Sequence, residues 1–240
     1  MDYSVITTSD PRQAVMKRFW GHWAKVEPDS ELMPRELIIV DDHGLWVELS
    51  DKQLQERCPS VPLRILRPTQ RLGQARALRR GAEAASCELL LFIDPDMVDV
   101  AESTPALLAP FAAGAAAVHG QRCSGASSNS IRRAGSWLFN VSVRAISGLA
   151  IPDINSPVFV HRRQNLSLLS QAPAGLTNPQ FALYAQLANN VVIVPINSQS
   201  AVSQPSSYSA WALVMLFFRQ LFDAWRVRSL KRATRTHPSR

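Results

Sequence analysis

Two pairs of aspartates are the residues of this sequence best suited to chemistry. Asp94 and Asp96 flank a proline directly after the apolar run ELLLFI. Asp41 and Asp42 directly follow a second apolar run, ELIIV. Carboxylate oxygens at a strand end can hold a divalent cation, and through it the phosphates of a ligand. The alternative is that both pairs are solvated turns, since Asp and Pro are ordinary turn residues; the adjacent His43 is interpreted as a turn or surface histidine.

Apolar runs and helical stretches alternate along the chain and must position these acids. The pattern predicts an α/β fold with a mainly parallel central sheet. In such sheets ligands bind beyond the carboxyl ends of the strands, so both acidic pairs are expected at one edge. The expected strands are 3–8, 36–40, 63–66, 88–93, 115–119, 157–161 and 190–196, and the expected helices are 12–25, 73–85, 103–112, 131–147, 178–189 and 209–228.

Length and composition are typical of one globular domain with a small appendage. The chain has 240 residues, of which 46% are hydrophobic. We expect a domain over 1–200, followed by a loop, an amphipathic helix and a basic tail over 201–240. Most of the net charge of +7 lies in this tail, because 219–240 holds seven basic residues and one acid. A cationic patch of this kind suits an anionic membrane, a nucleic acid or solubility alone, but no nucleic-acid motif accompanies it.

The expected C-terminal helix has an apolar face and a charged face. Residues with helical spacing on the apolar face are Trp211, Val214, Phe218, Phe222 and Trp225. The apolar run 210–218 is too short to span a bilayer. Aromatic residues followed by a basic tail favour a helix that lies in the headgroup region of a membrane, through 209–240. The alternative is a helix packed on the domain or on a second subunit.

Three cysteines and the N-terminal sequence bear on the compartment. Cys58, Cys87 and Cys123 are too few, and odd in number, for a disulfide framework, which favours a reducing compartment. The first ten residues lack a basic start followed by an apolar run, so no signal peptide is expected. We therefore expect a cytoplasmic protein, peripheral on the inner face of the membrane.

Several blocks of the stretch 37–163 form a recognisable series. They are IIVDD (38–42), RPTQRLGQARALRRGAEAASCELLLFIDPDM (67–97), HGQR (119–122), and the spaced residues Arg132, Ser136, Asn140 and Asp153. By these blocks the stretch resembles family-2 glycosyltransferases of the GT-A, Rossmann-like fold, and it is most similar to dolichyl-phosphate mannose synthases and bacterial polyprenyl-phosphate glycosyltransferases. At the end of the first strand, the family's Pro-x-x-Asn-Glu pattern is replaced by TTSDP (7–11).

The resemblance implies a role for each matching residue. Asp41, Asp42, Gly73 and Asp94 would bind the nucleotide. Asp94 and Asp96 would hold Mg²⁺ or Mn²⁺ and the diphosphate. Asp153 would border the sugar as a third catalytic position.

Three further residues are expected to bind the acceptor's phosphate. The resemblance assigns this role to Arg122, Arg132 and Ser136, and arginine suits it because its guanidinium donates paired hydrogen bonds to phosphate. The alternative for Arg132 is a solvated helix face.

The expected function is that of a hexosyltransferase that moves a sugar from a UDP- or GDP-sugar to polyprenyl phosphate. A phosphate acceptor is already an anion, so the reaction needs no strong base, and in-line attack would invert the anomeric carbon. One alternative is transfer to a polysaccharide hydroxyl, which requires a general base; only Asp153 is a candidate. Another is a degenerate GT-A domain that binds nucleotide-sugar without turnover.

Overall fold

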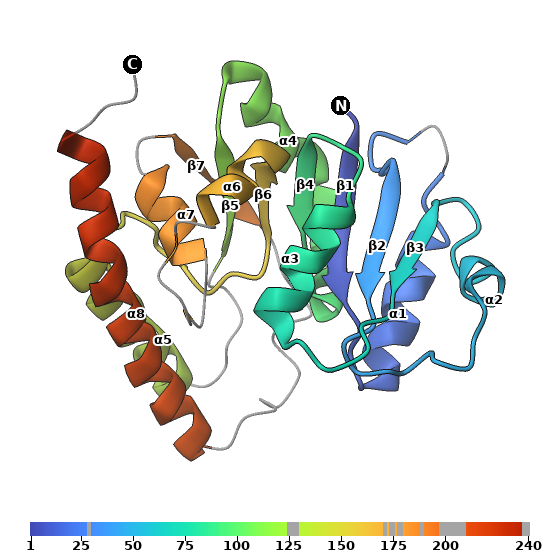
Figure 1. Cartoon of the computed structure of the whole chain (residues 1–240), viewed down its shortest axis with the longest axis horizontal. Coiled ribbons are helices and arrows are strands. Elements are labelled where there is room, and N and C mark those ends of the chain that lie inside the picture. The colour runs from blue at the N-terminus through green and yellow to red at the C-terminus, as the bar shows by residue number, and fades with distance from the viewer. Residues whose placement is uncertain are drawn as a thin grey trace.

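The computed structural model contains one seven-stranded sheet with helices on both faces (Figure 1). The structure describes residues 1–27, 30–123, 130–169, 172, 176, 180–187, 190–196 and 210–236. For residues 130–134, 210–214 and 229–236 it describes the backbone only. The strands are β1 (Tyr3–Thr8), β2 (Glu36–Val40), β3 (Leu63–Leu66), β4 (Leu89–Phe92), β5 (Ala117–Arg122), β6 (Phe159–Arg162) and β7 (Val191–Ile196).

The strand order is β3-β2-β1-β4-β6-β5-β7, and β6 is the strand that runs antiparallel to its neighbours. The chains of β1, β2 and β4 are buried along their whole lengths, as expected for a sheet covered on both faces. Because β1 lies between β2 and β4, the loops after these three strands meet at one edge. The predicted α/β class and mainly parallel sheet are therefore confirmed.

Two layers of helices cover the N-terminal part of the sheet. The helix α1 (Gln13–Trp23) and the 3₁₀ segment η1 (Pro95–Ser103) share one core with β1 and β2, which includes Phe19 and Trp23. The helix α3 (Gln74–Ala84) packs on the other face. A Cβ at Gly81 would lie 2.6 Å from Ile6, so the absence of a side chain there allows α3 to approach β1 closely.

The remaining elements are shorter or lie in the C-terminal part of the chain. They are α2 (Asp51–Gln55), α4 (Thr104–Leu108), η2 (Ala109–Ala113), α5 (Ser130–Ser147), η3 (Arg163–Asn165), α6 (Leu166–Leu169), α7 (Gln180–Gln186) and α8 (Ala210–Thr236). The long helices α5 and α8 lie side by side beyond β5 and β7 (Figure 1), and α8 also packs on α7. None of the helices in the described part of the chain has the length and apolarity needed to cross a lipid bilayer.

The structure adds α2, η3 and α6, which were not predicted, and it differs from two of the predicted helices. The expected helix 103–112 is replaced by the 3₁₀ segment η1, which begins directly at Pro95, by the five-residue α4 and by η2. Prolines near the start of each segment lack the N–H that a continuous helix needs, which breaks the stretch. The last helix, expected over 209–228, continues to Thr236; the loop expected at 197–209 lies outside the described residues.

Candidate active site

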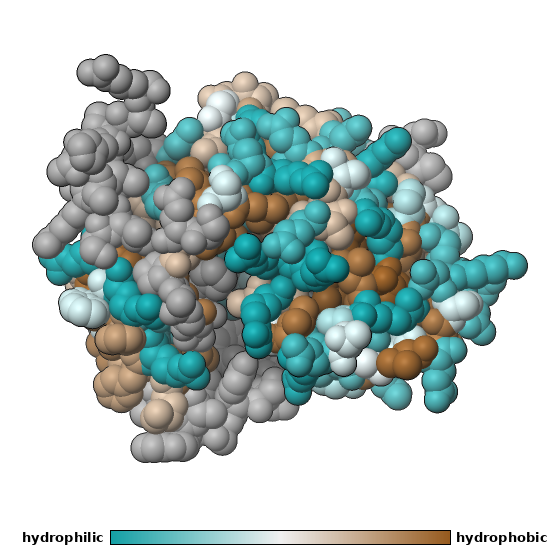
Figure 2. Space-filling model, in the orientation of Figure 1, coloured by the Kyte–Doolittle hydropathy of each residue, from teal (hydrophilic) through white to brown (hydrophobic). Residues whose placement is uncertain are grey.

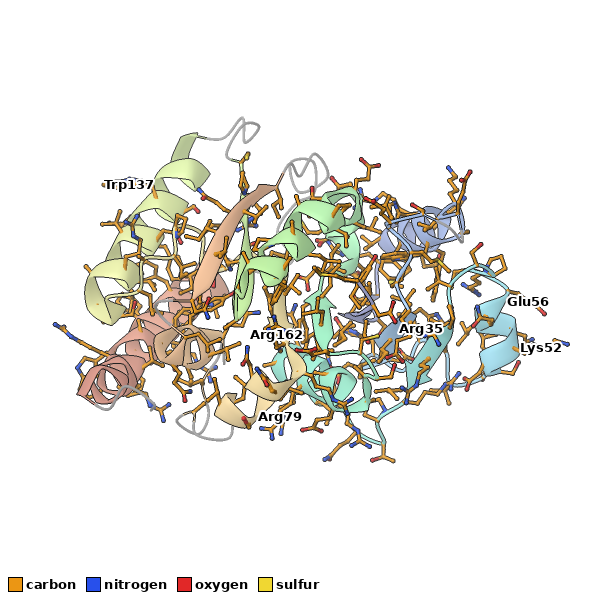
Figure 3. All side chains as sticks on the ribbon, turned by 90° about the horizontal axis from the view of Figure 1, so that it is seen from above. Arg35, Lys52, Glu56, Arg79, Trp137 and Arg162 are labelled. Atoms are coloured by element: carbon orange, nitrogen blue, oxygen red, sulfur yellow. The ribbon has the colours of Figure 1, made fainter. Side chains whose placement is uncertain are left out.

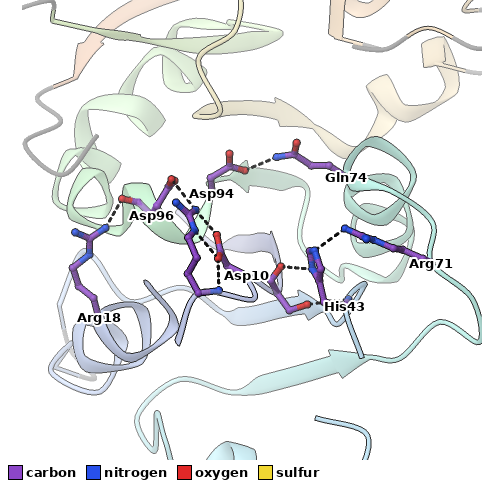
Figure 4. A network of polar contacts seen from close by, with 9 residues as sticks. Asp10, Arg18, His43, Arg71, Gln74, Asp94 and Asp96 are labelled. Atoms are coloured by element: carbon purple, nitrogen blue, oxygen red, sulfur yellow. Dashed lines mark hydrogen bonds and ion pairs between the residues drawn. The ribbon is translucent and has the colours of Figure 1, made fainter. Parts of the chain in front are cut away.

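The carboxyl ends of β1, β2 and β4 bring five acidic residues to one edge of the sheet. Asp10 follows β1, Asp41 and Asp42 follow β2, and Asp94 and Asp96 follow β4. Hydrogen bonds through Ser9 and Arg12 link these strand ends (Figure 4). The expectation that both predicted acidic pairs meet at one edge is met by the strand order.

An arginine joins two of these acids across the edge. Arg12 Nε donates to Asp10 Oδ1 at 2.8 Å, and its Nη2 donates to Asp10 Oδ2 and, at 3.2 Å, to Asp96 Oδ2. Arg18 on α1 donates to the main-chain carbonyl of Asp96 at 2.6 Å. Desolvation raises the pKa of Asp10, but the hydrogen bonds from Arg12 outweigh it, so the pKa of Asp10 is lowered. The same bonds with Asp10 raise the pKa of Arg12.

Asp94 has the most perturbed carboxyl group of the site. Its Oδ1 accepts a hydrogen bond from Gln74 Nε2 at 2.8 Å, which ties the end of β4 to the first turn of α3. Desolvation, and then repulsion from Asp96, raise the pKa of Asp94 to about 7. Clustered carboxylates of this kind are stabilised by a cation, since each negative charge opposes ionisation of the others.

The aspartates after β2 hold the main chain of two loops. Asp41, which is 2% exposed, accepts hydrogen bonds from the amides of Leu45 and Trp46, both at 2.9 Å. Asp42 accepts from the amides of Leu72 at 2.6 Å and Gly73 at 3.0 Å. These bonds use both oxygens of each carboxylate. Binding of nucleotide by these two acids stays a prediction; their observed contacts hold the main chain after β2 and before α3.

Gly73 begins α3 in a conformation that favours glycine, with φ of +79°. Its amide is held by Asp42, so the first turn of α3 is fixed against the end of β2. Gln74, which contacts Asp94, follows directly. Gly73 thus lies between the two acidic pairs, and its role in nucleotide binding, which the resemblance implies, stays a prediction.

His43 and Arg71 form the outer part of the same edge (Figure 4). His43 Nδ1 lies 3.0 Å from the carbonyl of Ser9, and its Nε2 lies 2.8 Å from Arg71 Nη2. Since an arginine only donates, Nε2 accepts and Nδ1 carries the proton that goes to Ser9. His43 therefore links the ends of β1 and β2 to the loop before α3. The sequence predicts only a turn or surface histidine at this position.

A second ion pair lies beside the acids, on the C-terminal part of the sheet. Arg122 Nε donates to Asp153 Oδ2 at 2.7 Å, and its Nη2 donates to Asp153 Oδ1 at 2.9 Å. These bonds, and then the nearby charges of Asp94 and Asp96, raise the pKa of Arg122. His119 accepts from or donates to Tyr184 at 2.8 Å and contacts the Asp153 carbonyl at 2.7 Å. The structure therefore brings Arg122 and Asp153 to the site, and the contact of His119 with the Asp153 carbonyl helps to hold Asp153 in place.

The other two predicted acceptor residues lie on α5. The Arg132 side chain lies outside the described residues. Ser136 is exposed, and its carbonyl accepts a hydrogen bond from Asn140 Nδ2 at 3.0 Å. Within the described part of the chain, no hydrogen bond joins Ser136 to the acidic edge. A role for Arg132 and Ser136 in acceptor binding stays a prediction.

The amino-acid sequence also matches the model of a known protein family. The model of glycosyl transferase family 2 matches residues 24–166, which is more than half of the chain. The chain belongs to glycosyltransferase family 2. The predicted membership is thereby confirmed, and the matched region contains both acidic pairs and the Arg122–Asp153 pair. No curated protein matches this family-2 chain.

Solved structures show the same fold as this family-2 glycosyltransferase. One is glucosyl-3-phosphoglycerate synthase from Mycobacterium tuberculosis with Mn²⁺, uridine diphosphate and glucosyl-3-phosphoglycerate, at 15% identity and a TM-score of 0.63. A complex of that enzyme with Mn²⁺, UDP-glucose and phosphoglyceric acid gives 16% identity and a TM-score of 0.63. Each match covers 95% of this chain and 79% of the other. At this identity the likeness establishes the GT-A fold, which confirms the predicted fold class.

Sequence reasoning missed several residues of the site. The sequence predicts Asp10 only as part of TTSDP (7–11), the segment that replaces the family's pattern, and it predicts no role for Arg12, Arg18 or Gln74. One signal was present in the sequence. Asp10 follows the first strand of an α/β pattern, and the loop after a strand is where such folds place ligand-binding residues. Its pairing with Arg12 and the contact to Asp96 depend on the strand order, which the pattern of residues does not contain.

Proposed function

We propose that this family-2 glycosyltransferase moves a hexosyl group from a UDP- or GDP-sugar to polyprenyl phosphate, with Mg²⁺ or Mn²⁺. The site contains acids for a cation and an arginine for a phosphate. Similar structures carry Mn²⁺ with UDP or UDP-glucose, which supports this class of donor and metal. The observation that carries the choice of acceptor is the Arg122–Asp153 pair.

The acids after β4 are suited to the proposed metal. Asp96 is one-third exposed, and Asp94 has a pKa raised by desolvation and by the charge of Asp96. A divalent cation between them would remove this repulsion, and carboxylate oxygens are the ligands that Mg²⁺ and Mn²⁺ prefer. Bound there, the metal would neutralise charge on the departing diphosphate. Asp94 and Asp96 are the residues that would hold it.

The Arg122–Asp153 pair favours an acceptor that is already an anion. Both carboxylate oxygens of Asp153 accept hydrogen bonds from Arg122, so Asp153 is poorly placed to take a proton from a sugar hydroxyl. A phosphate oxygen needs no such base. Arg122 also presents a positive charge beside the acids, where it would hold an acceptor phosphate near the donor. The pair therefore argues against transfer to a polysaccharide hydroxyl.

The proposed reaction is one displacement at the anomeric carbon. An oxygen of the acceptor phosphate forms a bond to that carbon while the bond to the donor's diphosphate breaks, and the nucleoside diphosphate leaves. Attack opposite to the leaving group inverts the anomeric configuration. The protein's contribution is positioning and fixed positive charge, which can supply most of the rate enhancement of such a transfer.

The helices α5 and α8 support a site of action at a membrane surface. In the described part of α8, Phe218, Phe222 and Trp225 are each more than half exposed. Hydrophobic atoms reach the surface at the lower left of Figure 2, where α5 and α8 lie. On α5, Trp137 is 67% exposed and points away from the sheet (Figure 3). Arg219, Arg226 and Arg228 alternate with the apolar residues of α8.

Aromatic residues mixed with arginines suit the interface of an anionic bilayer. We therefore propose that the protein is peripheral on the inner face of the membrane, where it meets a lipid acceptor.

A second candidate function is transfer to a small phosphorylated acceptor. Similar structures were determined with phosphoglyceric acid and with glycerol 3-phosphate. Such a molecule shares the phosphate that Arg122 would bind but carries no lipid chain. It would leave the exposed apolar faces of α5 and α8 without a function in catalysis.

A transfer assay separates these acceptors. The full chain with Mn²⁺ is given labelled UDP-hexoses or GDP-hexoses, with undecaprenyl phosphate in detergent, with 3-phosphoglycerate, or with no acceptor. We expect label in the lipid fraction, and Asp96→Asn is the inactive control. Transfer to 3-phosphoglycerate alone would replace the first proposal by the second. Nucleotide binding without transfer to either acceptor would mean that the domain binds its ligand without turnover.

A further inference from the structure

Arg12 donates hydrogen bonds to two carboxylates, and the two contacts are unequal. To Asp10 it donates through Nε, through Nη2 and through its own amide, the first and last at 2.8 Å. To Asp96 it donates through Nη2 alone, at 3.2 Å. The two residues of the first pair are separated by one position in the chain, whereas Asp96 lies on another strand end. The contact with Asp10 is therefore the fixed one and the contact with Asp96 the breakable one.

Exposure of the carboxylates supports the same division. The Asp10 side chain is 13% exposed, and the Asp96 side chain is 32% exposed. A long contact to a partly solvated carboxylate contributes little, because water competes for both partners. The bidentate pair with Asp10 is geometrically specific and holds the guanidinium in place. Arg12 can thus lose Asp96 and still be positioned by Asp10.

Asp96 is also the carboxylate that would bind the metal of the proposed reaction. A divalent cation held by the Asp96 carboxylate would compete with the Arg12 guanidinium, because two positive groups close to one carboxylate repel each other. If Asp96 held a metal without nucleotide, Arg12 Nη2 would lose this contact and gain no new anion in exchange, although Arg12 would remain paired with Asp10. Metal that arrives with a diphosphate brings such an anion to the same place.

We propose that Arg12 is an exchangeable counterion of this site: its Nη2 pairs with Asp96 before ligands bind and, while the guanidinium stays on Asp10, exchanges Asp96 for the donor's diphosphate when metal and nucleotide bind. This inference rests on the proposed function, because it needs a metal-assisted nucleotide donor. Two consequences follow. Metal and nucleoside diphosphate bind cooperatively, and metal alone binds weakly. Arg12 acts on binding by pairing in turn with the enzyme and with the ligand.

The chain offers a matched control in Arg18. It also lies next to Asp96, but it donates to the main-chain carbonyl at 2.6 Å and leaves the carboxylate alone. Arg12→Gln and Arg18→Gln remove the same charge from the same neighbourhood. A difference between them therefore reports on the contact with the carboxylate. Arg12→Lys keeps the charge and loses the bidentate geometry, and its melting temperature tests whether the loop is still folded.

The experiment measures binding rather than activity. Mn²⁺ affinity of the full chain is measured by electron paramagnetic resonance without nucleotide, and UDP and GDP affinities are measured calorimetrically with and without Mn²⁺. Arg12→Gln should bind Mn²⁺ alone roughly three- to tenfold more tightly than Arg18→Gln, as expected for the removal of one competing charge. It should bind the nucleoside diphosphate about tenfold more weakly in the presence of Mn²⁺. The proposed exchange therefore predicts that Arg12→Gln raises the affinity for Mn²⁺ alone and lowers the affinity for the nucleoside diphosphate.

The outcomes distinguish this inference from the proposed function. If wild type binds neither UDP nor GDP with Mn²⁺, the proposed function fails and the exchange fails with it. If wild type binds them but Arg12→Gln and Arg18→Gln have equal affinity for Mn²⁺ alone, the exchange alone is overturned. It is also overturned if Arg12→Gln weakens Mn²⁺ binding, since Arg12 would then support the metal site. Arg12→Lys with intermediate values for both ligands would strengthen it.

Discussion

The N-terminal half of the molecule, residues 1–116, and the C-terminal half, 117–240, differ in their characteristic side chains. The first has hydrogen-bonded acids at the sheet edge, and the second has exposed apolar side chains. In the N-terminal half the acids at the sheet edge are tied to main-chain amides, to Gln74 or to Arg12. In the C-terminal half eight large apolar side chains of the described residues are exposed, against three in the N-terminal half. One half is built around fixed charges, and the other offers apolar surface.

This difference indicates a division of labour within one sheet. Fixed, hydrogen-bonded acids suit a small charged donor that must be held in a single geometry. Exposed aromatic and aliphatic residues on two adjacent helices suit a broad partner such as a bilayer surface. The Arg122–Asp153 pair joins the end of β5 to the turn before β6, so it belongs to the C-terminal half but lies near the charges of Asp94 and Asp96.

The largest expected effect is on catalysis, from loss of one acid of the N-terminal half. Asp96→Asn should lower sugar transfer about a thousandfold, because it removes a carboxylate from the metal and diphosphate. The melting temperature should stay the same or rise, since Asp94 loses a repelling neighbour. Asp51→Asn, at an exposed pair with Arg67, is the control and should keep full transfer. Wild-type transfer by Asp96→Asn would show that the fixed charges have another purpose.

The junction of the two halves should respond to pH through His161. This residue of β6 is 2% exposed and stacks on Phe92 of β4, and desolvation lowers its pKa to about 4. An unfolded histidine has a pKa near 6.5, so the unfolded chain takes up the proton first as the pH falls. Stability is therefore full above pH 6.5 and is lost toward pH 4, by about 2 kcal/mol at pH 5 and about 3 kcal/mol in all.

Urea unfolding of wild type and His161→Phe at pH 7.5 and pH 5 isolates this effect. Other titrating groups are common to both proteins, so the variant should lose less stability than wild type over this interval. Equal losses in the two proteins would mean that His161 is not the group that couples the junction to pH.

A smaller effect is expected where an acid holds a loop. Asp42→Ala removes the carboxylate that accepts hydrogen bonds from the amides of Leu72 and Gly73, and a hydrogen bond to a charged group contributes about 1.5–3 kcal/mol. Chemical denaturation of the variant measures this cost, with Asp2→Ala on the exposed N-terminus as control. Asp42→Asn keeps one acceptor oxygen and should lie between. If Asp42→Ala lowers nucleotide affinity with full stability, the acid contacts the ligand directly.

Much of this arrangement could be predicted from the sequence because local patterns carry it. The runs YSVITT, ELIIV and ELLLFI are apolar enough to be recognised as buried strands, and each is followed by polar residues. Asp94 and Asp96 stand out for that reason. Arg12 does not, because its contact with Asp96 crosses from one strand end to another, 84 residues away. Only the placement of β1 beside β4 brings the two together.

In the C-terminal half, the sequence predicts the faces of a helix but not which of them is exposed. Apolar spacing identified the face of α8 that carries Phe218, Phe222 and Trp225, and all three are exposed in the structure. The exposed residues of α5, such as Trp137 and Leu138, were not singled out. A sequence pattern gives the faces of a helix but does not say which face a neighbouring helix covers. Here α5 and α8 cover each other on one side and leave their other sides open.

The smallest effect on stability is expected on that open surface. Phe222 of α8 is 57% exposed, so Phe222→Ser should change the free energy of unfolding by less than about 0.5 kcal/mol. The control is Phe217→Ser on the covered side, where the ring packs against Phe139, and it should destabilise by more than about 1 kcal/mol. Binding to anionic vesicles, measured by co-sedimentation, should weaken about tenfold in Phe222→Ser, as removal of one apolar anchor implies. Undiminished vesicle binding with reduced self-association would assign the surface to a second copy of the chain instead, and the division between a charged half and a membrane-facing half would be wrong.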